Sequence, residues 1–364
     1  MYTIDPLISK AATLPSDFYK SDEAWEACKE KVFCNNWQFL ADEQEVFKGL
    51  ENVYPLWLLE NYLDEPVILV NQDEQVKCYT NVCTHRGFLL VQHPAKMKKI
   101  VCGYHGRRFD LCGKFEAMPE FEEAEGFPRP CDSLSELTLG RWRQFIFTTI
   151  SPKTDFSVLV KRLEERLHFL PIESFKFEPK YSKTYNVHAH WALYCDNFLE
   201  GFHIPFVHQA LGSLLDYGSY TTECYDQMVL QIGYSDGTGL TFDLPEKHPD
   251  YGKNVAAYYY WLYPNFMLNF YPWGVQLNIV KPVTKDFCKV EFLYYIHDQK
   301  AFDILQGDKL AEKTEREDEF VVEAVQRGLR SRFYKAGRFS PKREKGVHYF
   351  HSLLSKSLSD SLSD

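Results

Sequence analysis

The chain has 364 residues, of which 45% are apolar and 16% aromatic, so it can bury one large core or fold as two domains. Its formal net charge is −10 and no block of Lys or Arg stands out, which argues against nucleic acid and anionic membranes as partners. The first twenty residues lack the basic start and apolar run of a signal peptide, and no apolar stretch is long enough to span a bilayer. We therefore expect a cytoplasmic protein.

The first predicted domain is an antiparallel β domain over residues 46–151. Short β-branched and aromatic runs, such as VILVNQ and VKCYTNVC, are separated there by polar turns. The stretch KKIVCGYHGRRFDLCGKF is typical of a strand, a loop, a second strand and a turn. The domain is therefore expected to carry functional side chains on its loops.

Two short segments of this domain each contain one cysteine and one histidine. CTHRG supplies Cys83 and His85, and CGYHG supplies Cys102 and His105. Zinc sites also combine these residue types. Two arms that each offer one Cys and one His suit a Rieske [2Fe–2S] centre better, because two thiolates bind one of its irons and two imidazoles bind the other. We therefore expect these four residues to hold a Rieske cluster.

The glycines and the remaining cysteines of the chain agree with this interpretation. Glycines that permit tight turns lie in both segments: Gly87, Gly103 and Gly106. The chain has ten cysteines, which are not expected to form a disulfide framework in a cytosolic protein of this size. Cys112, close to the two segments, is interpreted as structural.

A second motif lies in the stretch CDNFLEGFHIPFVHQAL, residues 195–211. Asn197, Glu200 and His203 are three residues apart, so on a helix they share one face and are candidate functional residues. His203 and His208 are five apart, too far around a regular helix to bind one metal. Pro205 between them predicts a bulge or kink that returns His208 to the face of His203.

A third metal ligand is expected, because non-haem Fe(II) oxygenases use two histidines and one carboxylate. The stretch TEREDEFVVEAVQRGLRS, residues 314–331, predicts a helix. Its apolar stripe is formed by Val321, Val322, Val325 and Leu329. Asp318 lies one turn earlier on the same side, but spacing alone does not separate it from its acidic neighbours Glu317 and Glu319.

Together these motifs resemble the α subunits of Rieske non-haem iron oxygenases, the aromatic-ring-hydroxylating oxygenase family, over nearly the whole chain. The resemblance implies an α+β protein with an N-terminal all-β Rieske domain and a C-terminal helix-grip (START-like) domain, an antiparallel sheet around a long helix. The implied order is a helical segment at 1–45 packed on the catalytic domain, the Rieske domain at 46–151, the catalytic domain at 152–350 and a polar tail at 351–364.

The resemblance also assigns roles to site residues. It implies that Asp318 completes the mononuclear Fe(II) site, with O₂ as co-substrate, and that Glu200 bonds His203 and reaches His105 of the neighbouring subunit. Most members have Asp where this chain has Glu200, whereas the subgroup of choline and carnitine monooxygenases resembles this chain in having Glu. Arg107 stands where many members have Trp, which we expect to change the docking surface of the cluster.

The resemblance further implies partners. Within one chain of the family the two centres are too far apart for fast electron transfer, so a head-to-tail homotrimer is expected. The sequence has no G-x-G-x-x-G after a strand and no flavin or NAD signature. Electrons are therefore expected from a separate NAD(P)H-dependent reductase, directly or through a ferredoxin.

The predicted function is that of an oxidoreductase which uses O₂ to hydroxylate a C–H bond of a small molecule. The aromatic stretch 257–280 could form a cage for a quaternary ammonium group through cation–π attraction, or simply pack a large sheet. Hydroxylation of an N-methyl group would give a demethylated amine and formaldehyde. The alternatives are cis-dihydroxylation of an aromatic ring and, in another class, a Rieske electron carrier whose second domain only binds a ligand.

Overall fold

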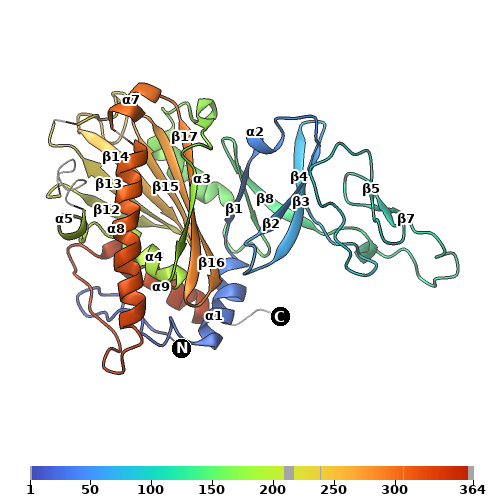
Figure 1. The fold of residues 1–364 in the computed structure, drawn as a ribbon, viewed down its shortest axis with the longest axis horizontal. Helices are drawn as coiled ribbons and strands as arrows, with labels where there is room; N and C mark the ends of the chain where they lie inside the picture. Colours follow the sequence, from blue (N-terminus) through green and yellow to red (C-terminus); the bar gives the residue numbers. More distant parts are fainter. Residues whose placement is uncertain (1, 209–216, 238, 306, 360–364) are drawn as a thin grey trace. The chain divides into compact units, whose positions relative to one another are not determined.

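The computed structural model describes residues 2–208, 217–237, 239–305 and 307–359 (Figure 1). The chain divides into two compact units. One is Cys34–Lys153, and the other combines the chain before Cys34 with the chain from Thr154 onward. Within the described ranges, no helix is both long enough and apolar enough to cross a membrane.

The Cys34–Lys153 unit contains two antiparallel sheets. In the described chain one sheet has six strands in the order β1-β9-β8-β4-β3-β2, and the other has three in the order β5-β6-β7. The elements are β1 (Gln38–Asp42), α2 (Glu43–Val46), β2 (Val53–Leu58), β3 (Glu65–Gln72), β4 (Gln75–Thr80), β5 (Ile100–Val101), β6 (Arg108–Phe109), β7 (Phe115–Ala117), a 3₁₀ turn η2 (Pro130–Asp132), β8 (Glu136–Trp142) and β9 (Phe145–Thr149).

This unit begins before residue 46, the start expected from the sequence. β1 pairs with β9, so that Gln38 lies opposite Thr148, and the Ser151 N–H donates to the Cys34 carbonyl. Residues 38–42 therefore belong to the sheet and not to a segment packed on the catalytic domain. A five-residue strand carries too few alternations of apolar and polar residues to be recognised from its sequence.

The core of this unit positions the two predicted cluster segments. Successive residues of β3 point to opposite faces, which sends Ile68 and Val70 into one hydrophobic cluster and Val67 and Leu69 into another. The first cluster also contains both Cys83 and Cys102. The two cysteine side chains are thus anchored in the hydrophobic core.

The second unit is built on one large antiparallel sheet. In the described residues its order is β10-β17-β16-β15-β14-β13-β12, with β11 also paired to β17. The strands are β10 (Lys176–Phe177), β11 (Lys183–Val187), β12 (Thr221–Tyr225), β13 (Met228–Tyr234), β14 (Val255–Leu262), β15 (Phe266–Tyr271), β16 (Gly274–Thr284) and β17 (Phe287–Ile296). The helical elements are α1 (Asp22–Cys28), a π turn η1 (Lys29–Phe33), α3 (Phe156–Leu167), a 3₁₀ turn η3 (Ile172–Ser174), α4 (Trp191–Phe198), α5 (Ile204–Val207), α7 (Gln299–Ile304), α8 (Gly307–Gly328) and α9 (Lys345–Ser359).

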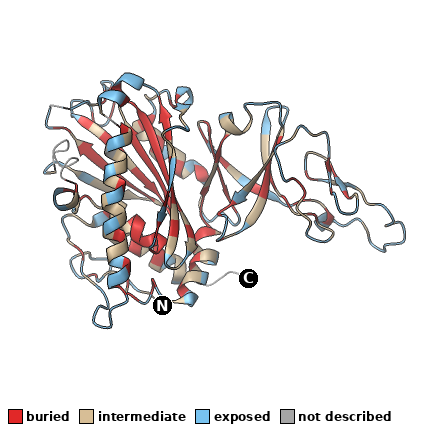
Figure 2. Cartoon of the chain, viewed as in Figure 1, coloured by how far each residue is buried: buried red, intermediate tan, exposed pale blue. Residues whose placement is uncertain are grey.

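The long helix α8 lies along one face of this sheet (Figure 1). Its Arg316 guanidinium stacks on the Tyr185 ring of β11, and α8 also packs against α4. The central strands of this sheet, β13 to β16, are almost entirely buried (Figure 2). The predicted α+β class, with an antiparallel sheet around a long helix, is confirmed.

Helix α8 differs from its prediction in length and in its buried face. It begins at Gly307, earlier than residue 314, and Val325 of the predicted apolar stripe is 44% exposed. Val322 of the predicted stripe is buried, as is Leu329 directly after the helix, but the other described buried side chains of the helix include the polar Glu315 and Gln326. Apolar periodicity does not reveal polar residues on a buried face, so the predicted stripe is only partly correct.

The predicted polar tail at 351–364 is also revised. Residues 351–359 belong to α9, and the Leu354 side chain has no exposed surface. His351 is buried as well, and it bonds Asp196 of α4 through Nε2 at 2.9 Å. The serine-rich sequence concealed an amphipathic helix, because leucines recur in it at helical spacing. Residues 360–364 lie outside the described chain.

Candidate metal centres and substrate cavity

The chain around the two histidines is not the single bulged helix that its sequence predicts. Helix α4 ends at Phe198, and the four-residue helix α5 follows after a turn. His203 precedes α5 and His208 follows it, so the two rings flank one helical turn. The Glu200 carboxylate ends the longer helix by accepting from the N–H groups of Phe202 and His203. This local capping, together with Pro205, brings the histidines together in place of a bulge.

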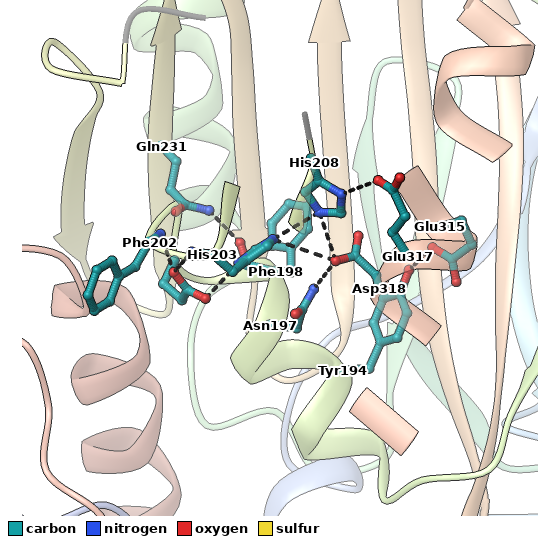
Figure 3. Close-up of polar contacts among 11 residues, drawn as sticks. Tyr194, Asn197, Phe198, Phe202, His203, His208, Gln231, Glu315, Glu317 and Asp318 are labelled. Carbon is teal, nitrogen blue, oxygen red and sulfur yellow. Dashed lines mark hydrogen bonds and ion pairs between the residues drawn. The ribbon is translucent and has the colours of Figure 1, made fainter. Parts of the chain in front are cut away.

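Two histidines and one aspartate face one another beside α4. One ligand atom from each of His203, His208 and Asp318 lies within 4.8 Å of the others. Asp318 Oδ1 is 3.0 Å from His208 Nε2 and 3.5 Å from His203 Nε2, and the two Nε2 atoms are 3.1 Å apart. Figure 3 shows His203 and His208, from the two ends of α5, facing Asp318 of α8.

The geometry distinguishes Asp318 from its acidic neighbours. Glu319 turns away and accepts from the Arg316 guanidinium at 2.7 Å. Glu317 reaches the other side of a histidine, where its Oε2 lies 2.8 Å from His208 Nδ1. Of the three acids, Asp318 is therefore the one whose carboxylate oxygen lies close to both Nε2 atoms, so that all three atoms could bind one metal ion.

Three further contacts orient the facing groups. Glu200 Oε1 lies 2.6 Å from His203 Nδ1, and Glu317 makes the corresponding contact with Nδ1 of His208. Asn197 Nδ2 donates to Asp318 Oδ1 at 2.6 Å. The candidate residues Asn197 and Glu200 thus both contact the triad, whereas the role of Glu317 was not anticipated. The only feature of the sequence that pointed to this role of Glu317 was its position directly before the candidate ligand Asp318.

This donor set fits a metal cation. Each histidine presents Nδ1 to a carboxylate, which places its ring proton there and leaves a lone pair on Nε2. Two such lone pairs and a carboxylate oxygen are all acceptors and repel one another unless a cation lies between them. Two imidazoles and one carboxylate are the ligand set of non-haem Fe(II) sites, which leaves positions for O₂ and substrate.

The pKa of His208 reflects the surrounding acids. Burial lowers it, but the hydrogen bonds and negative charges of Asp318 and Glu317 outweigh burial and raise the pKa above its usual value. The site therefore carries a negative field that favours a cation.

A cavity with about 200 Å³ of free volume opens beside the triad, between α4, α8 and the sheet. Its wall includes all three facing residues together with Glu315 of α8, whose side chain is buried. Tyr194 donates to Glu315 Oε2 at 2.5 Å. Burial, and then the nearby Asp318 charge, raise the pKa of Glu315 well above its usual range. The cavity thus offers room for a small molecule next to the triad.

The cluster segments of the other unit form two matched loops. In the first, the Gly87 N–H donates to the Cys83 carbonyl at 2.9 Å, and in the second the Gly106 N–H donates to the Cys102 carbonyl at 3.1 Å. Both glycines have positive φ angles, 70° and 73°, which side chains would disfavour. The repeated Cys-to-Gly turn gives both loops the same backbone path.

The four predicted cluster residues come together at these loops. Cys83 and Cys102 are buried, while His85 is half-buried and His105 exposed. The two imidazole rings lie with centroids 4.9 Å apart. Two buried thiols with two outer imidazoles are the donors that a Rieske cluster requires, so the group fits.

Arg107, whose presence in place of Trp was expected to change the docking surface of the cluster, does not itself lie on the surface. Its side chain is 2% exposed and donates to Asp132 at 2.7 Å, between the rings of Phe115 and Phe127. The same Asp132 accepts, through its backbone carbonyl, from the Thr84 hydroxyl at 2.8 Å. One residue of the η2 turn therefore holds both cluster loops, which explains why a buried cation follows CGYHG.

The fold and the two donor sets define a protein with two iron centres, one suited to electron transfer and one to oxygen chemistry. Comparison with known proteins agrees with this class. Residues 36–128 match the Rieske [2Fe–2S] domain family, and residues 176–360 match the ring-hydroxylating α-subunit catalytic domain family. The chain therefore belongs to the ring-hydroxylating oxygenase α-subunit family and is a Rieske non-haem iron oxygenase. Its cofactors are a [2Fe–2S] cluster and a mononuclear iron, with O₂ as co-substrate.

Individual relatives resemble it over most of their length. Chloroplastic choline monooxygenase of Beta vulgaris is 28% identical, with 98% of this chain and 80% of that protein covered. The carnitine monooxygenase oxygenase subunit of Escherichia coli K12 is 25% identical, with 96% and 95% covered. A solved quaternary ammonium Rieske monooxygenase has the same fold, with a TM-score of 0.77 and 21% identity over 99% of this chain and 100% of that one.

Proposed function

We propose that this chain is the oxygenase component of a Rieske system that hydroxylates a C–H bond beside the nitrogen of a small quaternary ammonium compound. The observation that carries the proposal is a group of aromatic rings that lines the cavity beside the triad. The named activities of the choline and carnitine monooxygenases and the Glu200 position support it further.

The aromatic rings are Tyr259, Tyr271 and Trp273, from β14, β15 and the turn that follows β15. Tyr271 and Trp273 stack with centroids 5.1 Å apart and planes 13° apart, and Tyr259 meets Tyr271 edge-on at 5.8 Å. Rings around one cavity attract a quaternary ammonium group through their negative faces. The acidic groups of the same cavity add to this attraction.

The residues of the triad have separate roles in this proposal. His203, His208 and Asp318 would hold the iron, which when bound supplies the chemistry that activates O₂. Glu200 and Glu317 fix the two imidazole rings through Nδ1, and Asn197 holds the carboxylate of Asp318. The aromatic wall would keep the ammonium methyl groups beside this site and exclude water from it.

Electron delivery is proposed to cross a subunit boundary. Glu200 uses Oε1 on His203 and is 14% exposed, so it can accept from a second imidazole. His105 is exposed in its own unit and is suited to meet such an acceptor in a neighbouring subunit. The solved relative was described in terms of inter-subunit electron transfer. A head-to-tail homotrimer, supplied by an NAD(P)H-dependent reductase directly or through a ferredoxin, follows from this proposal, and the cytoplasmic location stays a prediction.

The substrate proposal is tested by turnover of the reconstituted protein with a surrogate reductase. At least one quaternary ammonium compound in a panel that includes choline and carnitine should stimulate O₂ uptake and give an aldehyde, formaldehyde or a hydroxylated product detectable by mass spectrometry. Aromatic hydrocarbons should not. A cis-diol from an aromatic ring, without turnover of any amine, would refute the proposal, and two irons per chain in place of three would identify an electron carrier.

The bridge is tested with Glu200→Gln, which keeps the side chain's shape but removes its charge and part of its acceptor capacity. Both metals should still bind, because Glu200 is not among the donor atoms. The chemically reduced cluster should no longer reoxidise when substrate and O₂ are mixed with it in a stopped-flow experiment. Glu319→Gln is the matched control, because Glu319 contacts Arg316 and not a histidine. Reoxidation at the parent rate in Glu200→Gln would disprove the bridge.

A further inference from the structure

A row of polar side chains crosses the sheet on the face that lines the cavity. Strand register places Gln231 of β13 opposite Tyr259 of β14, Tyr259 opposite Asn269 of β15, and Asn269 opposite Gln276 of β16. Asn278, two residues along β16, points to the same face. We refer to Gln231, Asn269, Gln276 and Asn278 as the amide belt. All four line the cavity.

The amide belt is buried but incompletely hydrogen-bonded. Its members are between 1% and 5% exposed. Gln231 Nε2 donates to the Phe198 carbonyl at 2.7 Å. Within the described chain, one atom of each belt residue has no partner: Gln231 Oε1, Asn269 Oδ1, Gln276 Nε2 and Asn278 Oδ1. Because these four residues line the cavity, a molecule that fills it can supply the hydrogen-bond partners that these atoms lack.

The described side chains around the cavity include no permanently charged cation. Its described wall includes the carboxyl groups of Glu200, Glu315 and Asp318 but neither Lys nor Arg. The sequences outside the described ranges, which include QALGSLLD at 209–216, contain no basic residue either. Apart from the iron held by the triad, a substrate carboxylate in this cavity would have no positive partner in the described wall, and at the amide belt it would meet only neutral amides.

From this arrangement, and resting on the proposed function, we infer that the amide belt binds an alcohol hydroxyl of the substrate, so that the enzyme accepts quaternary ammonium alcohols and rejects zwitterions that carry a carboxylate. The neighbouring atoms Asn269 Oδ1 and Gln276 Nε2 are an acceptor and a donor on paired residues. A hydroxyl group can donate to the first and accept from the second, whereas a carboxylate can only accept. Asn269 and Gln276 are therefore specificity-determining residues.

The test compares four ligands of similar size by calorimetric titration of the purified holoenzyme. Choline has the ammonium and the hydroxyl, tetramethylammonium lacks the hydroxyl, glycine betaine has a carboxylate in its place, and 3,3-dimethylbutan-1-ol lacks the charge. Choline should bind roughly tenfold or more tightly than each of the other three, because each lacks one favourable contact or adds an unpaired charge. Turnover should follow the same order.

Variants assign the preference to the belt. Asn269→Leu should abolish the advantage of choline over tetramethylammonium, because it removes the acceptor for the hydroxyl. Gln276→Lys should reverse the preference between choline and glycine betaine by supplying a cation. Asn265→Leu is the matched control, because Asn265 is equally buried near the same sheet but does not line the cavity.

Failure of the inference and failure of the proposed function give different results. If glycine betaine binds the parent enzyme as tightly as choline, or if Asn269→Leu leaves the choline preference intact, the belt does not select the hydroxyl and the inference is overturned. If the uncharged alcohol binds as tightly as choline, or no ammonium ligand binds, the quaternary ammonium proposal itself fails.

Discussion

Replacing Arg107 with methionine should destabilise the Cys34–Lys153 unit by about 3 kcal/mol, because it leaves the Asp132 carboxylate buried without its main cation. Breaking a buried ion pair typically costs about 3–5 kcal/mol. The low end applies here, since Asp132 keeps the Arg129 backbone N–H at 2.7 Å, while the Arg129 side chain is 67% exposed and compensates little. Methionine retains the apolar contact with Phe115 and Phe127 but loses the attraction of the cation to their rings.

The measurement is the thermal loss of cluster absorbance in the holoprotein, which should move down by roughly 10 °C for a unit of this size. The double variant Arg107→Met with Asp132→Leu is the control, because replacing both charges removes the unpaired carboxylate and should restore most of the midpoint. A shift below about 2 °C in the single variant, or no recovery in the double one, would show that the pair does not stabilise the loops.

Acidic buffer should reduce the difference in stability between the parent protein and Arg107→Met. Burial raises the pKa of Asp132, but hydrogen bonds from Arg129 and Arg107 outweigh burial and lower the pKa below its usual value. A carboxyl with a lowered folded-state pKa stabilises the fold above its unfolded-state pKa, and this contribution is lost as the pH falls through the folded value. The parent protein and Arg107→Met should therefore converge in stability in strongly acidic buffer and differ most near neutral pH.

Three further predictions follow from the sites. Asp318→Ala should abolish turnover and remove the mononuclear iron while the Rieske absorbance persists, whereas Glu319→Ala should retain all three irons per chain by metal analysis; the opposite pattern would move the ligand by one residue. His105→Cys should lower the reduction potential of the cluster, measured by voltammetry, because a thiolate adds negative charge, and an unchanged potential would remove His105 from the ligand set. Leu354→Ala should cost about 2–5 kcal/mol in chemical unfolding, because the side chain is fully buried in α9, and a neutral effect would restore the view of this segment as a tail.

The candidate metal residues could be found in the sequence because each set depends on short spacings. The separation of Cys83 from His85, and of His203 from His208, is fixed by the covalent chain and survives errors in local structure. The local structure itself was predicted less well. The helix before His203 ends early because the Glu200 side chain caps the following N–H groups, a local side-chain effect that hydrophobic periodicity does not reveal.

Polar residues on buried faces account for most of the remaining differences. Glu315 and Gln326 occupy the inner face of α8, where a pattern search expects apolar residues, and Arg107 occupies a core position after a cluster loop. Local rules fail at such positions because function or a specific ion pair requires a polar group there. The amide belt is harder still to anticipate, since its four members meet only through the register of four strands.

The aromatic stretch of β14 shows how two competing interpretations of one sequence can both apply. Side chains alternate between the two faces of a strand. Tyr258 and Tyr260 therefore have no exposed surface and pack the core, where Tyr258 also donates to Asp250 at 3.1 Å. Tyr259 between them points the other way and lines the cavity. The dense aromatic run therefore contributes both to the core and to the cavity wall. The alternation of side chains along the strand decides on which face each ring lies, and only the rings on the face of the amide belt can select a substrate.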